Sequence, residues 1–180
     1  MDDKIHIETE RIILRNFIEN DCEAVFAFSS NKEVQKYTGD AILESLNQAK
    51  EIISNVWFSD YQKYGYGRWA VVYKPKNKVI GFAGLKYLPE INETDIGYRF
   101  LPEYWGKGVA TEVSKKIIEY GFDVLKLEKI IGIAMPENIA SSKVLEKVGL
   151  DFHKFEPYDE GGENCNWYQI DKEKYHKLYS

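Results

Sequence analysis

The sequence predicts a single α/β domain over residues 1–180, and three observations support that fold class. Segments with strand-like apolar runs alternate with segments of helical periodicity, in the order strand, two helices, three strands, helix, strand, helix and two strands. Hydrophobic residues make up 44% of the chain and aromatic residues 14%, which is typical of a globular fold. No repeat, low-complexity tract or linker divides the sequence, which is long enough to bury roughly 70% of the surface of the unfolded chain.

The first half of the chain carries signals for strands, two helices and a hairpin. β-Branched residues favour strand structure before residue 17, either as one strand or as two short strands separated by residues 8–10. Polar residues that can accept N–H bonds precede two amphipathic segments, so Asn20 or Asp21 can cap the first helix and Ser45 the second. The elements expected here are, in order, strand structure over 5–17, helices carrying 24–28 and 49–57, a hairpin of 69–73 and 79–85, and a strand over 94–101.

The second half of the chain continues with helices, a buried strand and a last hairpin. Apolar residues recur at near-helical spacing after residue 109, and Gly149 stands where a left-handed residue commonly ends a helix. Gly161 and Gly162 can form the turn of the hairpin. The elements expected here are, in order, a helix over 111–125, a strand over 129–134, a helix over 140–148, strands over 152–158 and 164–170, and a short helical tail.

Charge, cysteine and histidine content argue against several function classes. The net charge is -5, with 24 Lys and Arg against 29 Asp and Glu, and no dense basic tract offers nucleic acid an electrostatic footprint. This balance favours a cationic or amine-bearing partner. Cys22 and Cys165 are far apart and the three histidines are scattered, so neither a disulfide framework nor a metal site is expected. The charged N-terminus and the lack of a long apolar run predict a cytoplasmic protein with no membrane association.

The segment from Trp105 to Thr111 is typical of a phosphate-binding turn. Gly106 and Gly108 let the main chain turn tightly and approach a ligand without interference from a Cβ atom. The helix that follows directs its free N–H groups and its partial positive charge toward that turn. A pyrophosphate group therefore fits there.

Three segments, in the right order, resemble the GNAT family of acyl-CoA-dependent N-acetyltransferases, and within it the RimJ/RimL-like subgroup of ribosomal-protein N-terminal acetyltransferases. Residues 9–15 resemble the opening strand, 96–108 the central strand and pyrophosphate loop, and 138–150 the coenzyme-binding helix. The resemblance implies a mixed, splayed seven-stranded sheet flanked by about four helices, with acetyl-CoA between the strands 94–101 and 129–135. It is also compatible with a homodimer, because the family often forms dimers.

The resemblance assigns roles to residues on either side of the coenzyme. Phe100 and Leu101 would offer main-chain bonds to the pantetheine arm, and Ser141 would protonate the leaving thiolate. Many family members place a Tyr general acid on the last helix, where this chain has Leu145. Trp105 stands where the general family pattern begins its loop with Gln or Arg. This difference matters little for phosphate binding, because main-chain N–H groups bind the phosphate. The coenzyme-binding residues implied are Phe100, Leu101, Trp105, Gly106, Lys107, Gly108, Val109, Ala110, Thr111, Asn138 and Ser141.

Acetyl transfer to an amine also needs a base and a donor to the oxyanion. A Lys-type amine with a pKa near ~10.4 is mostly protonated at neutral pH, so a carboxylate must accept its proton, directly or through water. Asp95 aligns with the catalytic Glu of the family and is one methylene shorter. An N–H near Phe100 or Leu101 would bind the oxyanion if the strand is bulged there. The competing carboxylates are Glu93, Glu156, Asp159 and Glu160.

The resemblance therefore implies an enzyme that transfers acetyl from acetyl-CoA to a primary amine by direct attack, without a covalent intermediate on either cysteine. A protein N-terminus, a polyamine and an aminoglycoside-like amine are all open as acceptors. The alternative is a non-catalytic acyl-CoA-binding module, which the replacement of the Tyr by Leu145 favours. An aromatic set before the second strand forms either core packing or a wall of the acceptor site; its members are Trp57, Tyr61, Tyr64, Tyr66 and Trp69.

Overall fold

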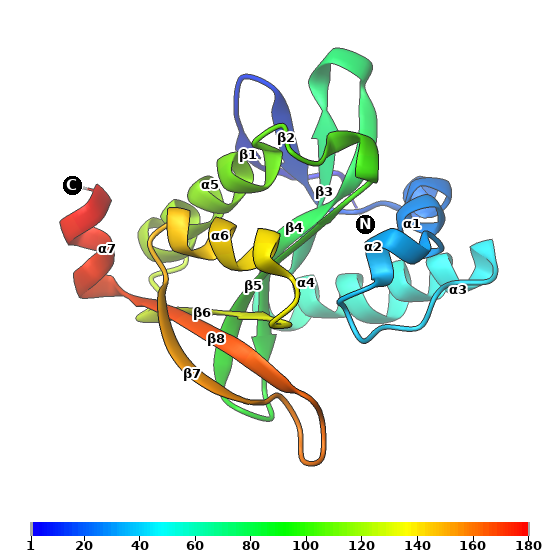
Figure 1. The fold of residues 1–180 in the computed structure, drawn as a ribbon. Helices are drawn as coiled ribbons and strands as arrows, with labels where there is room; N and C mark the ends of the chain where they lie inside the picture. Colours follow the sequence, from blue (N-terminus) through cyan, green and yellow to red (C-terminus); the bar gives the residue numbers. More distant parts are fainter. Residues whose placement is uncertain (1, 180) are drawn as a thin grey trace.

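A mixed eight-stranded sheet forms the centre of the protein, as seen in a computed structural model that describes residues 2–179 (Figure 1). The strand order is β1-β2-β3-β4-β5-β6-β8-β7. The strands are β1 (Ile5–Glu8), β2 (Ile12–Arg15), β3 (Arg68–Tyr73), β4 (Lys78–Leu88), β5 (Glu93–Phe100), β6 (Lys129–Ala134), β7 (Asp151–Pro157) and β8 (Asn164–Asp171).

This architecture confirms the mixed α/β class and corrects the strand count from seven to eight. The extra strand arises because the N-terminal strand region folds as two short antiparallel strands, which was one of the two alternatives. The main-chain N–H of Thr9 donates to the Ile12 carbonyl at 2.8 Å, and this turn reverses the chain between β1 and β2.

The helices also outnumber the four expected. The helices are α1 (Cys22–Ser29), α2 (Lys32–Gln35), α3 (Leu46–Glu51), the π-helical turn η2 (Ile52–Trp57), α4 (Phe58–Tyr64), α5 (Val109–Asp123), α6 (Ile139–Lys147) and α7 (Lys172–Tyr179). Single 3-10 turns lie at Glu19–Asp21, Lys74–Lys76 and Pro102–Tyr104. The segments α3, η2 and α4 follow one another without a break, as the second helix expected from the sequence, while the single turn of α2 was not predicted.

Only one of the two predicted caps forms. Ser45 accepts the N–H of Gln48 at the start of α3, as expected. Asp21 makes no side-chain cap on α1, because its carboxylate accepts bonds from Arg15 at 2.7 and 2.9 Å and from the Ile18 N–H at 3.0 Å. The predicted cap by Asp21 is therefore wrong, since a charged partner competes for the same oxygens.

The sheet opens between its two central strands. Strands β1 to β5 pair antiparallel in sequence order, and β6, β8 and β7 form a second antiparallel group. The two groups meet where β5 runs parallel to β6, and their register holds a single pair, Asp95 and Ile131. Beyond Asp95 the two strands diverge, which leaves one edge of β5 without a neighbouring strand.

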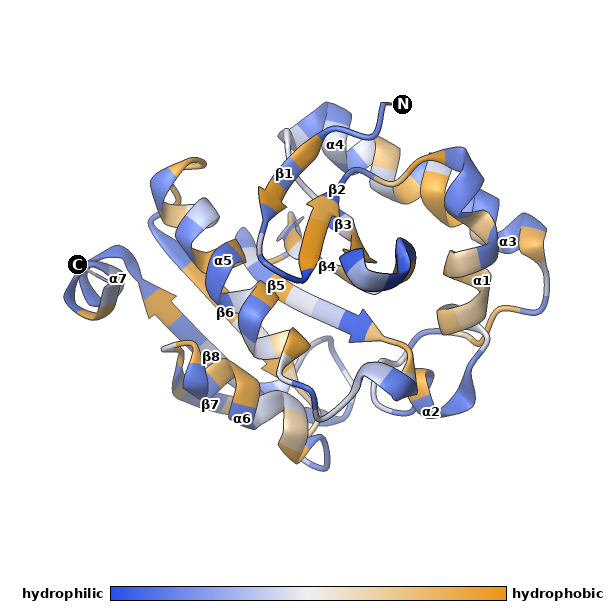
Figure 2. Cartoon of the chain, turned by 90° about the horizontal axis from the view of Figure 1, so that it is seen from above, coloured by the Kyte–Doolittle hydropathy of each residue, from blue (hydrophilic) through white to orange (hydrophobic). Residues whose placement is uncertain are grey.

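The helices cover opposite faces of this sheet. Helices α1 to α4 lie on one side, and α5 and α6 lie on the other (Figures 1 and 2). Phe82 of β4 contacts Phe28 of α1 at 6.0 Å between ring centroids, whereas Leu85 of the same strand reaches Gly121 of α5. In Figure 2, β2 is mostly hydrophobic in colour, and the helices carry both hydrophilic and hydrophobic segments.

The aromatic set before β3 belongs to the core. Trp57 and Trp69 are buried, and Trp57 stacks on Phe17 at 4.0 Å. The Tyr61 hydroxyl bonds to the Arg68 carbonyl and the Tyr66 hydroxyl to Thr94 at 2.9 Å. Core packing accounts for the set, because Trp57, Tyr66 and Trp69 are buried and Tyr61 and Tyr64 are half-buried against the same core. Full burial of a large apolar side chain stabilises by on the order of 1.5–3 kcal/mol.

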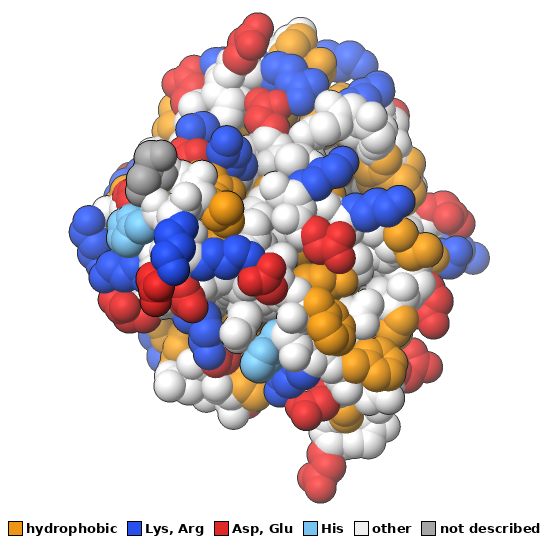
Figure 3. Space-filling view, turned by 60° about the vertical axis from the view of Figure 1, so that its left-hand side comes forward, with side chains coloured by type: hydrophobic (Ala, Val, Ile, Leu, Met, Phe, Trp, Pro, Cys, Tyr) orange, Lys and Arg blue, Asp and Glu red, His pale blue; other side chains and the backbone are white. Residues whose placement is uncertain are grey.

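The outer surface carries charges of both signs. On the face shown in Figure 3, Lys and Arg side chains are interspersed with Asp and Glu, and apolar side chains lie above the protruding hairpin tip. Within residues 2–179, no helix is both long and apolar enough to cross a membrane.

Candidate active site

A cleft of about 800 Å³ opens where β5 and β6 diverge, and residues from both faces of the sheet line it. Ten of the residues singled out from the sequence meet there. They are Asp95, Phe100, Trp105, Gly106, Gly108, Val109, Ala110, Thr111, Asn138 and Ser141. Of the twelve residues assigned a catalytic or coenzyme-binding role from the sequence, Leu101 and Lys107 are the two that lie outside its lining.

One end of the cleft is the N-terminus of α5. Gly106 and Gly108 adopt φ angles of +68° and +76°, which belong to the left-handed region that glycine tolerates best. Gly108 is the N-cap and supplies no side-chain bond, so the first N–H groups of this 15-residue helix remain open toward the cleft. The arrangement is suited to an anion such as a pyrophosphate.

Residues of the turn between β1 and β2 hold the glycine turn by hydrogen bonds. Glu112, in the first turn of α5, accepts bonds from Thr9 at 2.6 Å and from Arg11 Nε at 2.9 Å. Arg11 also donates to the Lys107 carbonyl at 3.2 Å, which holds the glycine turn. The pairing with Arg11 offsets a carboxylate that would otherwise repel a phosphate at this helix end. The Lys107 ammonium itself lies 5.8 Å above the Tyr104 ring and borders a separate cavity of about 130 Å³.

The edge of β5 offers main-chain groups to the cleft from alternate residues. The Leu101 N–H donates to Ile80 of β4 at 2.9 Å, and the β4–β5 register runs without a bulge from Phe100 to Glu93. Because hydrogen-bonding direction alternates along an antiparallel strand, Tyr98 and Phe100 direct their main-chain groups to the opposite side, into the cleft. The bulge expected near Phe100 is therefore absent, and Leu101 is already bonded within the sheet.

The α6 side of the cleft presents a pair of hydroxyl groups. Asn138 caps α6 by accepting the Ser141 N–H at 3.2 Å, which fixes the first turn. The Ser141 Oγ lies 3.0 Å from the Tyr98 hydroxyl, which also donates to the Ser141 carbonyl at 3.2 Å. Burial raises the pKa of Tyr98 well above its usual value. Sequence reasoning missed Tyr98, although its position between Ile96 and Phe100 on the cleft-facing side of a strand could have identified it.

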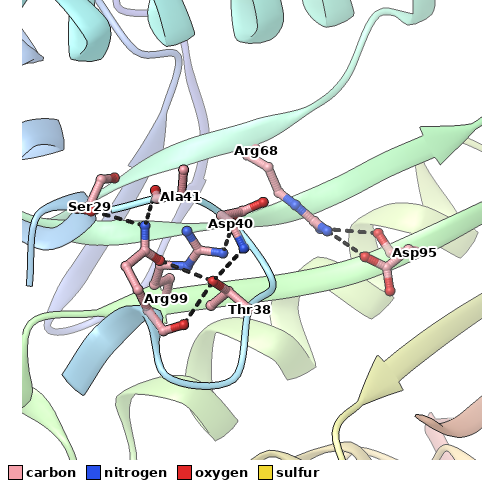
Figure 4. A network of polar contacts seen from close by, with 8 residues as sticks. Ser29, Thr38, Asp40, Ala41, Arg68, Asp95 and Arg99 are labelled. Atoms are coloured by element: carbon pink, nitrogen blue, oxygen red, sulfur yellow. Dashed lines mark hydrogen bonds and ion pairs between the residues drawn. The ribbon is translucent and has the colours of Figure 1, made fainter. Parts of the chain in front are cut away.

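The α1–α4 side of the cleft presents a buried ion pair. The Asp95 carboxylate bonds to the Arg68 guanidinium (Figure 4). Arg68 also donates to the main-chain carbonyls of Gly84 and Asp95. Burial raises the pKa of the Asp95 carboxyl above its usual value, and the positive charge of Arg68 opposes that rise. No local pattern in the sequence indicates Arg68 as the partner of Asp95.

Gly97 makes room for this ion pair. A Cβ atom at position 97 would collide with the Arg68 guanidinium, which crosses β5 at that point. Asp95 and Gly97 share one face of the strand, while Ile96 and Tyr98 share the other. The carboxylate and the Ser141–Tyr98 pair therefore flank the opening of the sheet from opposite sides.

The other candidate bases and the two cysteines lie outside the cleft lining. Glu93 is paired with Lys129, and Glu156 with Lys154 at 2.7 Å. Asp159 and Glu160 lie at the exposed tip of the β7–β8 hairpin. Cys22 and Cys165 are free thiols, and burial raises the pKa of Cys165, which disfavours its thiolate. Asp95 is thus the carboxylate that the fold brings together with Ser141.

Comparisons with known proteins match most of the chain to one family. Residues 11–151 match the family described as acetyltransferase (GNAT) domain. The chain is 37% identical over 144 residues to an uncharacterized N-acetyltransferase, YoaA, of Bacillus subtilis (strain 168). The aligned region covers 79% of this chain and 81% of that protein.

Solved structures share the fold over nearly the whole chain. A GNAT-family acetyltransferase from Bacillus anthracis superposes with a TM-score of 0.80 at 27% identity, covering 94% of this chain and 99% of that chain. A spermidine N-acetyltransferase from Vibrio cholerae, solved in complex with CoA and spermine, superposes with a TM-score of 0.75 at 20% identity, covering 93% and 99%.

Proposed function

This chain belongs to the GNAT acetyltransferase family, and on that premise we propose that it transfers acetyl from acetyl-CoA to a primary amine by direct attack. The observation that carries the proposal is the cleft between β5 and β6. It combines an open helix N-terminus, a free strand edge, and a carboxylate and a hydroxyl pair on opposite sides. Each of these parts corresponds to one requirement of the reaction.

The coenzyme would lie along β5 with its pyrophosphate at the start of α5. The N–H groups that follow Gly108 supply neutral donors for the phosphate oxygens, and the helix dipole adds favourable charge. The main-chain groups of Tyr98 and Phe100 that face the cleft can bond the amides of the pantetheine arm. Asn138 is already used as a helix cap, but its amide N–H₂ group is left for the same arm.

Acetyl transfer then makes one N–C bond and breaks one S–C bond. The neutral amine attacks the thioester carbonyl from the α1–α4 side and releases a proton to Asp95, directly or through a water. Its raised pKa makes Asp95 a stronger base than an exposed Asp. The thiolate leaves on the other side, where the Ser141 hydroxyl can protonate it and Tyr98 holds that hydroxyl in position.

Two acceptor classes follow from the relatives. The resemblance of residues 9–15 and 138–150 to ribosomal-protein N-terminal acetyltransferases supports a peptide N-terminus. The Vibrio cholerae relative is a spermidine N-acetyltransferase, which supports a polyamine. Both are primary amines, and both fit direct attack without an enzyme-bound acetyl group.

The test is release of free thiol from acetyl-CoA across a panel of amines. We expect turnover by the wild type, and a fall in kcat of roughly 10²-fold or more in Ser141→Ala and in Asp95→Asn, because each variant removes one proton transfer. Coenzyme affinity, measured by calorimetry, should change little in either. A protein that binds no acetyl-CoA would contradict the proposal outright.

A non-catalytic acyl-CoA-binding module is the second candidate, because Leu145 stands where many family members have a Tyr general acid. Leu145 is buried against Gly132 and offers no proton. The Ser141–Tyr98 pair supports the enzyme, since it supplies hydroxyl groups one helical turn before Leu145 in the same cleft. Tight coenzyme binding without turnover on any amine would favour the module.

A further inference from the structure

A second arginine lines the cleft with most of its hydrogen-bonding capacity unused. The Arg99 side chain is only 14% exposed, and its guanidinium lies 5.0 Å from the centroid of the Phe82 ring. Among residues 2–179 it makes one hydrogen bond, from Nη2 to Asp40 at 2.8 Å (Figure 4). A guanidinium has five N–H donors, so several N–H groups of this cleft-lining side chain make no hydrogen bond within the described residues.

Arg68, on β3, differs in this respect. Its guanidinium makes three hydrogen bonds, to the Asp95 carboxylate and to the carbonyls of Gly84 and Asp95. Arg99 therefore stands out as the buried cation that is available to a ligand. Basic side chains outnumber acidic ones around the cleft: Lys36, Arg68, Arg99, Lys143 and Lys147 against Glu33 and Asp95. Of these, Lys143 and Lys147 belong to α6 on the coenzyme side, so Arg99 is a cation of the acceptor side that Asp95 does not pair.

The present partner of Arg99 is a weak one. The Asp40 side chain is 62% exposed and lies in the loop between α2 and α3, so its ion pair competes with water. The loop itself is anchored independently of Arg99, because Gln35 donates to the Ser29 carbonyl at 3.0 Å and Thr38 accepts the Asp40 N–H at 3.1 Å. A carboxylate from a ligand can thus replace that of Asp40 while the loop stays in place.

The position of Arg99 assigns it to the acceptor. Arg99 lies on the same face of β5 as Asp95, the face opposite to Ser141. The Arg68 and Arg99 guanidinium carbons lie 6.0 Å and 5.0 Å from the Phe82 centroid, so they cannot be more than the sum of those distances apart. An amine held at Asp95 and an anionic group held at Arg99 would therefore belong to one small molecule or to the first residues of one peptide.

We propose that Arg99 binds a carboxylate of the acceptor, so that the acceptor class is amines that also carry a carboxylate, such as amino acids and short acidic peptides. The positive charge of Arg99 disfavours polyamines, so the inference selects between the two acceptor classes given above. The inference rests on the proposed acetyl transfer and adds the recognition element that selects the amine. Asp40 occupies the carboxylate position when no acceptor is bound.

The test compares acceptors that differ only in the carboxylate. Amino acids and their amides, dipeptides that differ as Glu against Gln or Asp against Asn, and spermidine are assayed for thiol release with saturating acetyl-CoA. A charge-assisted bidentate contact predicts a preference for the acid of roughly ten- to hundredfold in kcat/KM. Arg99→Met should bring that ratio close to one, and Asp40→Asn should lower KM for the acids because it removes the competing carboxylate.

The control is Lys78→Met, which removes one positive charge from an exposed site outside the cleft and should keep the preference. Equal or better use of amides or spermidine by the wild type would overturn the inference. An unchanged acid-to-amide ratio of kcat/KM in Arg99→Met would overturn it as well. Loss of acetyl-CoA binding in Arg99→Met would also overturn it, because that result would assign Arg99 to the coenzyme. If coenzyme binds and no amine releases thiol, the proposed acetyl transfer fails as well.

Discussion

Replacement of Arg68 by Met would leave the Asp95 carboxylate buried with no cationic partner. The two side chains are 12% and 14% exposed, so water can replace little of the lost interaction. Removing one member of a buried ion pair costs about 3–5 kcal/mol. Because both groups retain a little solvent contact, we expect the lower end, about 3 kcal/mol, in the free energy of unfolding at neutral pH.

The pH dependence of that loss has a definite sign. Burial already raises the pKa of Asp95, and Arg68 is the main group that opposes the rise. Without Arg68, the folded protein holds a proton on Asp95 over a range in which the unfolded chain, with a pKa near ~3.9, has lost it. Stability therefore falls as pH rises through that range and recovers as pH falls. The deficit of Arg68→Met should be smallest near pH ~4, where the unfolded chain also holds the proton, and should grow as pH rises toward neutrality.

Urea unfolding followed by tryptophan fluorescence, repeated across this pH range, measures the effect. The double variant Arg68→Met with Asp95→Asn is the matched control, since it removes the uncompensated charge and keeps the size of the side chain. It should recover most of the lost stability at neutral pH. A single variant within about 1 kcal/mol of the wild type, or a double variant no more stable than the single one, would refute the reasoning.

Three further predictions concern the coenzyme, the proton donor and a buried histidine. Gly108→Trp should abolish acetyl-CoA binding in calorimetry. The control Gly161→Trp should retain binding, because Gly161 also has a positive φ angle, +84°, and open space around it but lies outside the cleft. Equal losses of binding in the two variants would implicate backbone strain alone. Tyr98→Phe should lower kcat less than Ser141→Ala does while leaving KM for acetyl-CoA unchanged, because it removes only the group that orients the Ser141 hydroxyl; a larger loss than in Ser141→Ala would contradict that order. Burial lowers the pKa of His6 below its model-compound value of 6.5, so the unfolded chain binds more protons just below that pH and stability falls on acidification. His6→Gln should flatten the dependence of Tm on pH between ~5 and ~7, and an unchanged slope would contradict the assignment.

Much of the fold follows from local signals in the sequence. The buried strand β6 and the helix α5 were predicted within about two residues, because their apolar patterns extend over whole elements. Gly149 adopts a φ angle of +94° after α6, as its position indicated. The glycine turn before α5 was predicted for the same reason, since a left-handed φ at Gly106 and Gly108 is a property of the residue type.

The polar contacts of the site could not be predicted in this way. Arg68 and Asp95 are 27 positions apart, Tyr98 and Ser141 are 43 apart, and Asp40 and Arg99 are 59 apart. Each contact depends on the register of β5 against its neighbours, which no local pattern specifies. The same register decides that Phe100 faces the cleft and that Leu101 does not.

The errors at the N-terminal end have a similar cause. Asp21 has the residue type of a helix cap, and the proximity of Arg15 gives its carboxylate a different partner. The sequence does not decide whether the N-terminal region forms one strand or the two strands β1 and β2, because a run of β-branched residues does not show where the chain reverses.

A crystal structure of the protein with bound coenzyme A tests the central claim most directly. We expect the pyrophosphate to accept bonds from the N–H groups between Gly106 and Thr111, and the sulfur to lie within hydrogen-bonding reach of Ser141, between β5 and β6. The Asp95 carboxylate should then face the sulfur from the other side of the sheet. Coenzyme bound outside this cleft, or with its sulfur remote from both Ser141 and Asp95, would contradict the account.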